Sequence, residues 1–174
     1  ILTPGFVECH MHAKWTGEQL LNLDFQGVTS RQAILDAVAE KAANTPDGEW
    51  IEGDGWNELI WEDSHELITK NDLDAVAPNN PVFLLHMSVH TIAANSMALE
   101  AVGYTKDTPQ PEGAEIGHYE NGELNGMLYE NGALQPMLKA KPALTDEQHI
   151  ESLRLIGKKL NSFGITSVSY TQLR

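Results

Sequence analysis

Residues 4–12 read Pro-Gly-Phe-Val-Glu-Cys-His-Met-His. The Pro-Gly pair is typical of a turn, and the apolar run after it predicts a short buried strand over 6–11 with a polar end. His10 and His12 are two residues apart, so in extended backbone their side chains point to the same face. Two imidazoles at one strand end can bind the same divalent ion. In a chain with seven histidines, this spacing alone also arises by chance with a probability of roughly one in four.

The composition excludes several classes of protein. The 174 residues are 41% hydrophobic and 21% charged, as in an ordinary globular domain, and no run approaches the ~20 apolar residues that span a bilayer. The formal net charge of −14 repels phosphate backbones and anionic lipids, so we expect no nucleic-acid or membrane partner. The single Cys9 allows no internal disulfide and is compatible with the cytoplasm, where we expect the protein unless a segment before residue 1 carries an export signal.

Capping and turn signals outline the remaining elements. Ser30 is a typical N-cap residue, residues 145–148 form a capping-box pattern, and Asn121-Gly122 favours a β-hairpin turn. Together with the hydrophobic periodicity, these signals predict helices over 31–45, 69–77, 91–102 and 146–163, and strands over 49–56, 81–86 and 165–168. Residues 15–28 read as an irregular connection.

The order of the elements predicts part of a larger α/β fold. If the first and last strands are parallel neighbours, the middle of the chain is an insertion between them. A (β/α)8 TIM barrel takes roughly 250 residues or more, so two strands in 174 residues leave most of such a barrel unaccounted for. We therefore expect a partial barrel with an exposed apolar edge and poor solubility on its own. The expected parts are the first strand and metal-ligand loop (1–19), an inserted α+β subdomain (20–140), a helix with the next strand (141–168) and a non-native tail (169–174).

The stretch 4–12 resembles the Pro-Gly-hydrophobic-x-Asp-x-His-x-His signature of the first strand in the amidohydrolase superfamily. Further segments, in the same order along nearly the whole chain, resemble one branch, amidohydrolase family 3, which includes the N-substituted formamide deformylase-like proteins. These segments are 49–56, 72–74, 78–84, 90–99, 107–113, 125–130 and 164–168. The resemblance implies a metal-dependent hydrolase that acts on carbon–nitrogen bonds other than peptide bonds, with a small amide or formamide as substrate.

The resemblance also implies where the chemistry is carried. His10 and His12 would hold a divalent metal, which we expect to be zinc, and Glu8 stands where the family usually has Asp, as a candidate for holding a metal ligand in place. The remaining ligands and the general-base aspartate of such enzymes come from later strands, so we expect no catalytic residue within this chain and no activity of this chain alone. The full-length protein could form a homo-oligomer.

Three further residues are candidates for a substrate pocket. By the resemblance, His90 and Asn95 face the substrate cavity from the insertion; a backbone contact for His90 and a helix cap for Asn95 are equally well supported alternatives. Trp56 could line a pocket for an apolar substituent, although aromatics at this spacing belong more often to a core.

Two other functions remain open at the level of sequence. The chain could belong to a non-catalytic, acidic binding or regulatory module that keeps the fold without the metal. It could also be an intact small α+β protein whose resemblance to the family is local.

Overall fold

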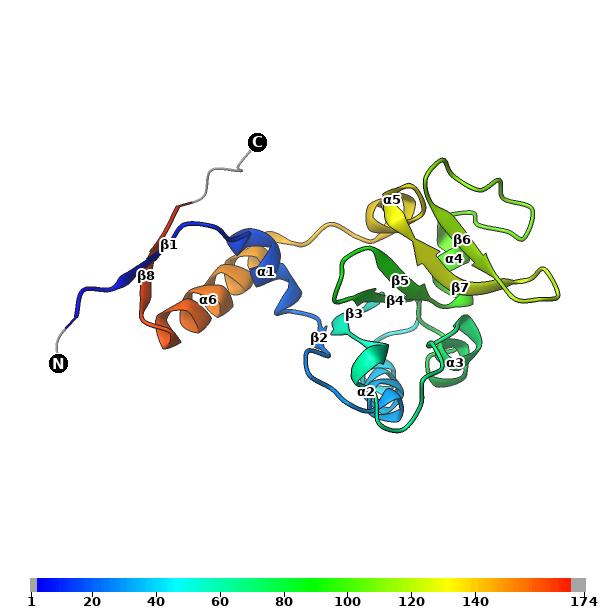
Figure 1. Cartoon of the computed structure of the whole chain (residues 1–174), viewed down its shortest axis with the longest axis horizontal. Helices are drawn as coiled ribbons and strands as arrows, with labels where there is room; N and C mark the ends of the chain where they lie inside the picture. The colour runs from blue at the N-terminus through cyan, green and yellow to red at the C-terminus, as the bar shows by residue number, and fades with distance from the viewer. Residues whose placement is uncertain (1–2, 170–174) are drawn as a thin grey trace. The chain divides into compact units, whose positions relative to one another are not determined.

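The computed structural model describes residues 3–169, and its elements form two compact units (Figure 1). Within the described residues, the smaller unit joins 3–22 to 143–169, and the larger unit spans 23–142. That the larger unit is a subdomain inserted into a barrel stays a prediction. The predicted tail, 169–174, lies outside the described residues from position 170 on.

A six-stranded mixed sheet forms the centre of the larger unit, in the order β2-β3-β4-β5-β7-β6. Strands β2 (Leu23–Asp24), β3 (Ile51–Trp56) and β4 (Val82–His86) are parallel to one another. Antiparallel pairing then joins β5 (Thr91–Ala94), β7 (Leu124–Tyr129) and β6 (Glu115–His118) to this half. A short 3-10 helix, η1 (Glu58–Ile60), follows β3. The strands predicted over 49–56 and 81–86 and the hairpin turn at Asn121-Gly122 are confirmed.

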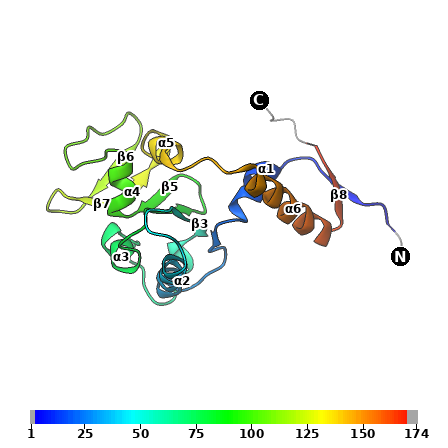
Figure 2. The same ribbon diagram turned by 180° about the vertical axis from the view of Figure 1, so that it is seen from behind.

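Helices cover both faces of this sheet and create two separate cores (Figures 1 and 2). Helices α2 (Arg31–Ala43) and α3 (Lys70–Val76) pack on one face, and α4 (Ser96–Ala101) and α5 (Glu130–Ala140) pack on the other. Alternate residues of β4 enter different cores: Val82 and Leu84 face α2 and α3, whereas Phe83 and Leu85 face α4 and α5. Burial on both faces explains why β4 is a continuous apolar run.

The helix predicted over 91–102 is wrong for its first four residues. Residues Thr91–Ala94 form β5, which pairs with β4 on one side and β7 on the other, and the helix begins only at Ser96. Alanine favours helix locally, but small side chains also fit a strand that is buried on both faces and bonded at both edges. Gly103, which follows this helix, has a φ of 73°, the left-handed conformation in which many helices end.

The smaller unit consists of two parallel strands and two helices that pack together. Strand β1 (Phe6–Glu8) pairs with β8 (Ile165–Val168), and α1 (Ala13–Gln19) packs against α6 (Asp146–Ser162). The helices approach closely at Gly17, where a Cβ atom would lie 2.8 Å from the carbonyl oxygen of Ser152. Helix α6 begins with the predicted capping box, because Thr145 Oγ1 accepts the N–H of Gln148 and the Gln148 side chain accepts the N–H of Thr145.

Apolar side chains remain exposed on this small sheet. Phe6 and Val7, neighbours in β1, are 61% and 64% exposed. Val168 on β8 and Phe163 at the end of α6 are exposed as well. Two parallel strands with solvent on both faces are unusual, because parallel sheets are normally covered on both sides. None of the helices in the described part of the chain has the length and apolar character that crossing a bilayer requires.

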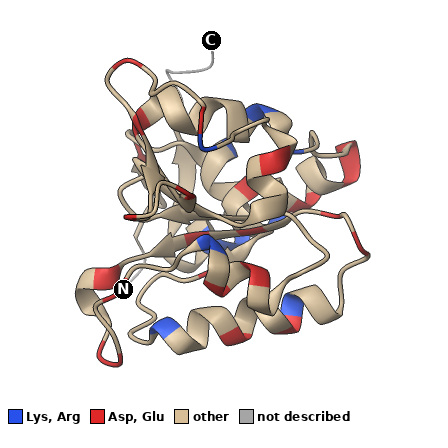
Figure 3. Ribbon diagram, turned by 90° about the vertical axis from the view of Figure 1, so that its right-hand side faces the viewer, with Lys and Arg blue, Asp and Glu red and all other residues tan. Residues whose placement is uncertain are grey.

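The net charge of −14 comes entirely from the larger unit. Residues 23–142 contain six Lys and Arg against twenty Asp and Glu, whereas the remaining residues contain five of each. Figure 3 shows the acidic positions spread over several helices and loops. A unit with this net negative charge disfavours the binding of anions.

One of these carboxylates, Asp63, caps helix α2. It accepts hydrogen bonds from the N–H groups of Gln32 and Arg31 and from the hydroxyl of Ser30, at 3.0, 2.8 and 2.7 Å. The bonds to the Gln32 N–H, the Ser30 hydroxyl and the Arg31 N–H, in that order, lower the pKa of Asp63 from 3.8 to about 2. Because the folded-state pKa is depressed, the stabilisation is complete above the unfolded value of 3.8 and is lost as the pH falls towards 2.

We expect Asp63→Asn to lower the stability of the full-length protein at pH 7, and the difference from the unsubstituted protein to shrink between pH 4 and pH 2. Urea midpoints, measured by tryptophan fluorescence at low protein concentration across this pH range, test the expectation. Asp107→Asn, at an exposed aspartate of another loop, is the matched control. A stability difference that is equally large at both ends of the range would contradict the capping role of Asp63.

Candidate functional site

His10 and His12 lie just beyond the carboxyl end of β1. The strand predicted to reach Met11 ends at Glu8; His10 then occupies a bend, and His12 is the N-cap of α1. Both histidines are exposed. The prediction that they project from the strand itself is therefore wrong in detail, and the pair instead lies in the loop between strand and helix. This is the position at which a parallel α/β barrel carries its catalytic residues.

Glu8 fixes the backbone from which His10 projects. Its Oε1 accepts the backbone N–H of His10 at 2.8 Å, and its carbonyl oxygen accepts the N–H of Ser169, which follows β8, at 2.8 Å. The Glu8 carboxylate therefore fixes the turn after β1 by a hydrogen bond to the backbone of His10. Its support of His10 runs through the backbone.

The backbone of His12 is fixed by the start of α1. Its carbonyl oxygen accepts the N–H of Thr16 at 2.9 Å, the first bond of the helix. The imidazole lies edge-on to the indole of Trp15, with ring centroids 6.0 Å apart and an interplanar angle of 67°. The helix start and the indole of Trp15 both limit the orientations open to the His12 ring.

The donors present fit part of a zinc site. Imidazole nitrogen is a preferred zinc ligand, and a structural or catalytic site needs three or four protein ligands. Across residues 3–169, no three His, Cys, Asp or Glu side chains are grouped closely enough to hold a metal ion. His10 and His12 match two such ligands by residue type, and a complete site that included them would need ligands from outside the described residues.

Asn95 lies in the interior of the larger unit. It is fully buried, its Oδ1 accepts the N–H groups of Val82 and Ala98, and its Nδ2 donates to the carbonyl oxygens of Asn80 and Ala77. These four bonds cap α4 and join it to the start of β4. Of the two roles considered for Asn95, the helix cap is the one that this geometry supports.

Trp56 belongs to the core. It is 1% exposed, its Nε1 donates to the carbonyl oxygen of Leu84 at 3.1 Å, and its ring stacks on Trp61 with centroids 5.8 Å apart. The edge of His86 contacts the same indole, with centroids 4.5 Å apart. The indole has almost no surface with which to line a pocket, and the core interpretation accounts for its position.

His90, in contrast, is open to solvent and paired with a carboxylate. Its side chain is 61% exposed, and Nδ1 lies 2.9 Å from Oε2 of Glu130. The two residues are 40 positions apart, and antiparallel pairing of Thr91 with Tyr129 brings them together. Among the described residues, Val89 and Glu130 are the non-glycine residues with positive φ, at 59° and 62°. Such conformations cost of order 1–3 kcal/mol each; Val89 directly precedes His90, and Glu130 is itself a member of the pair.

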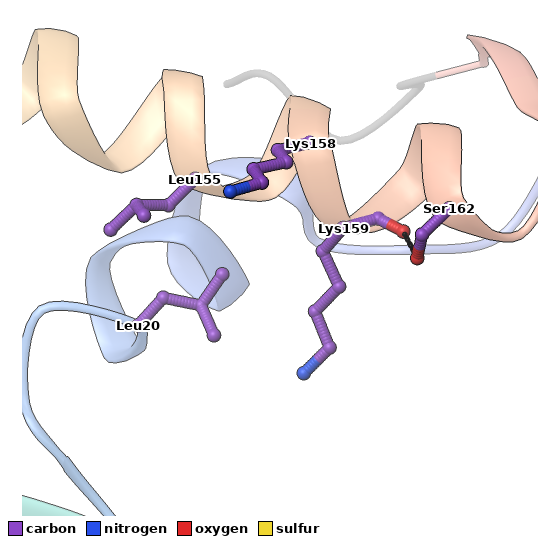
Figure 4. A pocket seen from close by; sticks show the side chains of 5 residues that line it. All are labelled: Leu20, Leu155, Lys158, Lys159 and Ser162. Atoms are coloured by element: carbon purple, nitrogen blue, oxygen red, sulfur yellow. Dashed lines mark hydrogen bonds between the residues drawn. The ribbon is translucent and has the colours of Figure 1, made fainter.

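A shallow depression of about 310 Å³ in the smaller unit is lined by Leu20, Leu155, Lys158, Lys159 and Ser162 (Figure 4). The Ser162 hydroxyl donates to the carbonyl oxygen of Lys159. Leu20 is the C-cap of α1 and His12 is its N-cap, so the depression and the histidine pair lie at opposite ends of that helix. The depression is not part of the candidate metal site.

Comparison with protein families shows to which family the chain belongs. Residues 1–173 match the model of the amidohydrolase family. The chain belongs to this family. It is 38% identical over 166 residues to YtcJ of Bacillus subtilis (strain 168), a protein whose name places it among the amidohydrolases; the match covers 95% of this chain and 31% of YtcJ. It is 28% identical over 172 residues to the N-substituted formamide deformylase of Arthrobacter pascens, covering 96% of this chain and 32% of the enzyme.

Solved structures of metal-dependent hydrolases share the fold of this amidohydrolase chain. A hydrolase from Pyrococcus horikoshii superposes with a TM-score of 0.63 at 23% identity, and one from Pyrococcus furiosus with 0.60 at 24% identity. The alignments cover 96% and 95% of this chain but 30% and 31% of the hydrolases. The chain thus spans about a third of the length of the relatives that it matches.

Proposed function

We propose that the protein carrying this chain is a zinc-dependent hydrolase of carbon–nitrogen bonds other than peptide bonds, and that His10 and His12 are two of its metal ligands. The observation that carries the proposal is the placement of both histidines after β1, beside its parallel neighbour β8, in a chain that matches the amidohydrolase family over 1–173. The remaining strands of a (β/α)8 barrel would cover the exposed side chains of β1 and β8. The larger unit would be an insertion in that barrel.

In this proposal, residues of this chain would bind the metal ion and keep its ligands in position. His10 and His12 would hold the ion through neutral imidazole nitrogens, and Glu8 would keep the His10 backbone in place. When bound, a zinc ion lowers the pKa of a coordinated water and polarises the carbonyl of an amide. The general base and the other ligands would come from outside the described residues.

Comparison of the full-length protein with the 174-residue chain tests this proposal. We expect the full-length protein to contain stoichiometric divalent metal and to hydrolyse small amides, with N-benzylformamide as the first substrate because a relative is named as an N-substituted formamide deformylase. We expect the chain alone to be inactive, to bind metal weakly because it has two of the required ligands, and to self-associate through Phe6, Val7 and Val168.

Elemental analysis, amide hydrolysis assays and size-exclusion chromatography measure these three properties. A full-length protein without stoichiometric metal and without hydrolysis of any amide would reject the enzyme and favour a non-catalytic module on the same fold. A chain of 174 residues that is monodisperse and unfolds cooperatively would reject the partial barrel.

A further inference from the structure

The six-stranded sheet of the larger unit ends at two edge strands, β2 on one side and β6 on the other (Figure 1). Strand β2 is two residues long, whereas β6 is four residues long and offers more backbone for pairing. An edge strand presents N–H and C=O groups that can pair with another chain, and proteins commonly block such edges. The outer side of β6 is therefore a surface at which association could occur.

The side chain of Gln110 occupies this outer side of β6. Its Oε1 accepts the backbone N–H of Ile116 at 2.7 Å, and its Nε2 donates to the carbonyl oxygen of the same residue at 2.9 Å. Ile116 lies opposite Leu128 of β7, but its backbone groups point away from β7, because these groups alternate between the two sides of a strand. One carboxamide thus makes both bonds that a residue of a further strand would make with Ile116.

The segment that carries Gln110 is poorly suited to extend the sheet itself. Pro109 and Pro111 flank Gln110, and proline has no backbone N–H to donate to a further strand. Within residues 109–111, Gln110 therefore supplies the one backbone donor. The carboxamide completes the hydrogen bonds of β6, while the backbone that carries it offers little to a new partner.

Helix α5 holds the loop that carries this carboxamide. A Cβ atom on Gly132 of α5 would lie 2.9 Å from Cβ of Ala114 and 3.1 Å from Cβ of Pro111, so the loop packs directly against the helix. The hydroxyl of Tyr104, at the start of the loop, donates to the carbonyl oxygen of Ala133 at 3.0 Å. The carboxamide is therefore presented to β6 by a loop that is fixed at both of its ends.

We propose that Gln110 keeps the edge of β6 closed against a second copy of this chain, whose own β6 is the partner that the open edge would fit. Two copies of one edge strand are self-complementary: about a two-fold axis, Ile116 of each copy would exchange its N–H and C=O with the other. Each larger unit carries twenty acidic against six basic residues, so the two copies repel each other, and salt weakens this repulsion. The inference concerns association and is independent of metal binding and hydrolysis.

Hydrogen exchange of the full-length protein, measured by mass spectrometry of peptides, tests whether Gln110 closes the edge. At low protein concentration we expect Gln110→Ala to speed exchange in peptides that contain the Ile116 amide about 3- to 10-fold, the effect of one lost hydrogen bond. Exchange in the other strands of the larger unit should be unchanged. Gln135→Ala, at an exposed glutamine of α5, is the control and should leave the Ile116 peptides unchanged.

Sedimentation velocity over a range of protein concentrations tests the partner. We expect Gln110→Ala to associate further than the unsubstituted protein, and more strongly at high salt than at low salt. In the associated species the Ile116 peptides should regain protection, because strand pairing gives the Ile116 N–H a new acceptor. Gln110→Glu keeps an acceptor for this N–H and adds a negative charge at the edge, so it should sediment like the unsubstituted protein.

Several results would overturn the inference. Unchanged exchange of the Ile116 peptides in Gln110→Ala would mean that Gln110 does not protect the edge, and faster exchange throughout the larger unit would mean general destabilisation. Faster exchange without further association at any concentration would reject the second copy as the partner. Association that leaves the Ile116 peptides unprotected, or that is equally strong in Gln110→Glu, would place the contact elsewhere.

Discussion

Replacement of His10 or His12 by alanine in the full-length protein is expected to abolish amide hydrolysis and metal binding together. Groups that merely orient a metal ligand typically contribute 10- to 100-fold, so the loss of a ligand should lower kcat/KM by more than about 100-fold. Among residues 3–169, no group of three His, Cys, Asp or Glu side chains could hold a metal ion, so we expect no other side chain of these residues to replace either histidine. His149→Ala, in the same unit, is the matched control and should keep metal and activity.

Glu8 allows a finer version of the same experiment. Because Glu8 Oε1 supports His10 by accepting its backbone N–H, Glu8→Gln should retain this bond and most of the activity, whereas Glu8→Ala should lose about 10- to 100-fold. Equal losses in the two variants would indicate that the charge of Glu8, and not its hydrogen bond, matters. Full metal content in both histidine variants would contradict the assignment of His10 and His12.

Replacement of Asn95 by alanine should destabilise the protein by about 3 kcal/mol or more. The substitution leaves two buried N–H groups, of Val82 and Ala98, and two buried carbonyl oxygens, of Ala77 and Asn80, without their partner. Each unsatisfied buried group costs about 1–3 kcal/mol, and the loss of the cap on α4 is part of the same effect. Urea denaturation of the full-length protein measures the change.

The control for this substitution is Asn44→Ala, at an exposed asparagine whose side chain donates to the carbonyl oxygen of Glu40 at the end of α2. Its effect should stay below about 1 kcal/mol. If Asn95→Ala left stability unchanged but raised KM, Asn95 would be a substrate residue after all, and the buried network would have been assigned the wrong role.

Local signals predicted the elements that local interactions define. Ser30 caps α2 by accepting the N–H of Ala33, Thr145 and Gln148 form the capping box of α6, and the apolar run of β4 forms a strand. Each of these signals acts over four residues or fewer, or through burial that the composition of the run reveals. Such features are readable from a single sequence.

Elements defined by distant partners were predicted less well. Residues Thr91–Ala94 form a strand because β4 and β7 bond to both of its edges, which outweighs the helix preference of alanine. Helix α5 was not predicted, since Pro136 lies inside it and Gly132 in its first turns weakens the pattern. Helix α1 was taken for an irregular connection, because its seven residues carry no side-chain cap.

In the candidate site, too, the sequence revealed the features that depend on neighbouring residues and missed those that depend on distant ones. The histidine pair follows from the spacing and from the resemblance of residues 4–12 to a family signature, both of which are visible in the sequence. The pairing of His90 with Glu130 joins residues 40 positions apart across two strands, and no periodicity reveals it. The burial of Asn95 and Trp56 likewise depends on the packing of the whole sheet, so sequence alone left their roles as alternatives.

The most direct test of the central claim is anomalous X-ray diffraction from crystals of the full-length protein, recorded on both sides of the zinc absorption edge. The account predicts one or more anomalous peaks after β1, with imidazole nitrogens of both His10 and His12 at zinc-bonding distance. A complete map with no metal beside these two histidines, or with their rings turned away from a metal bound elsewhere, would contradict it.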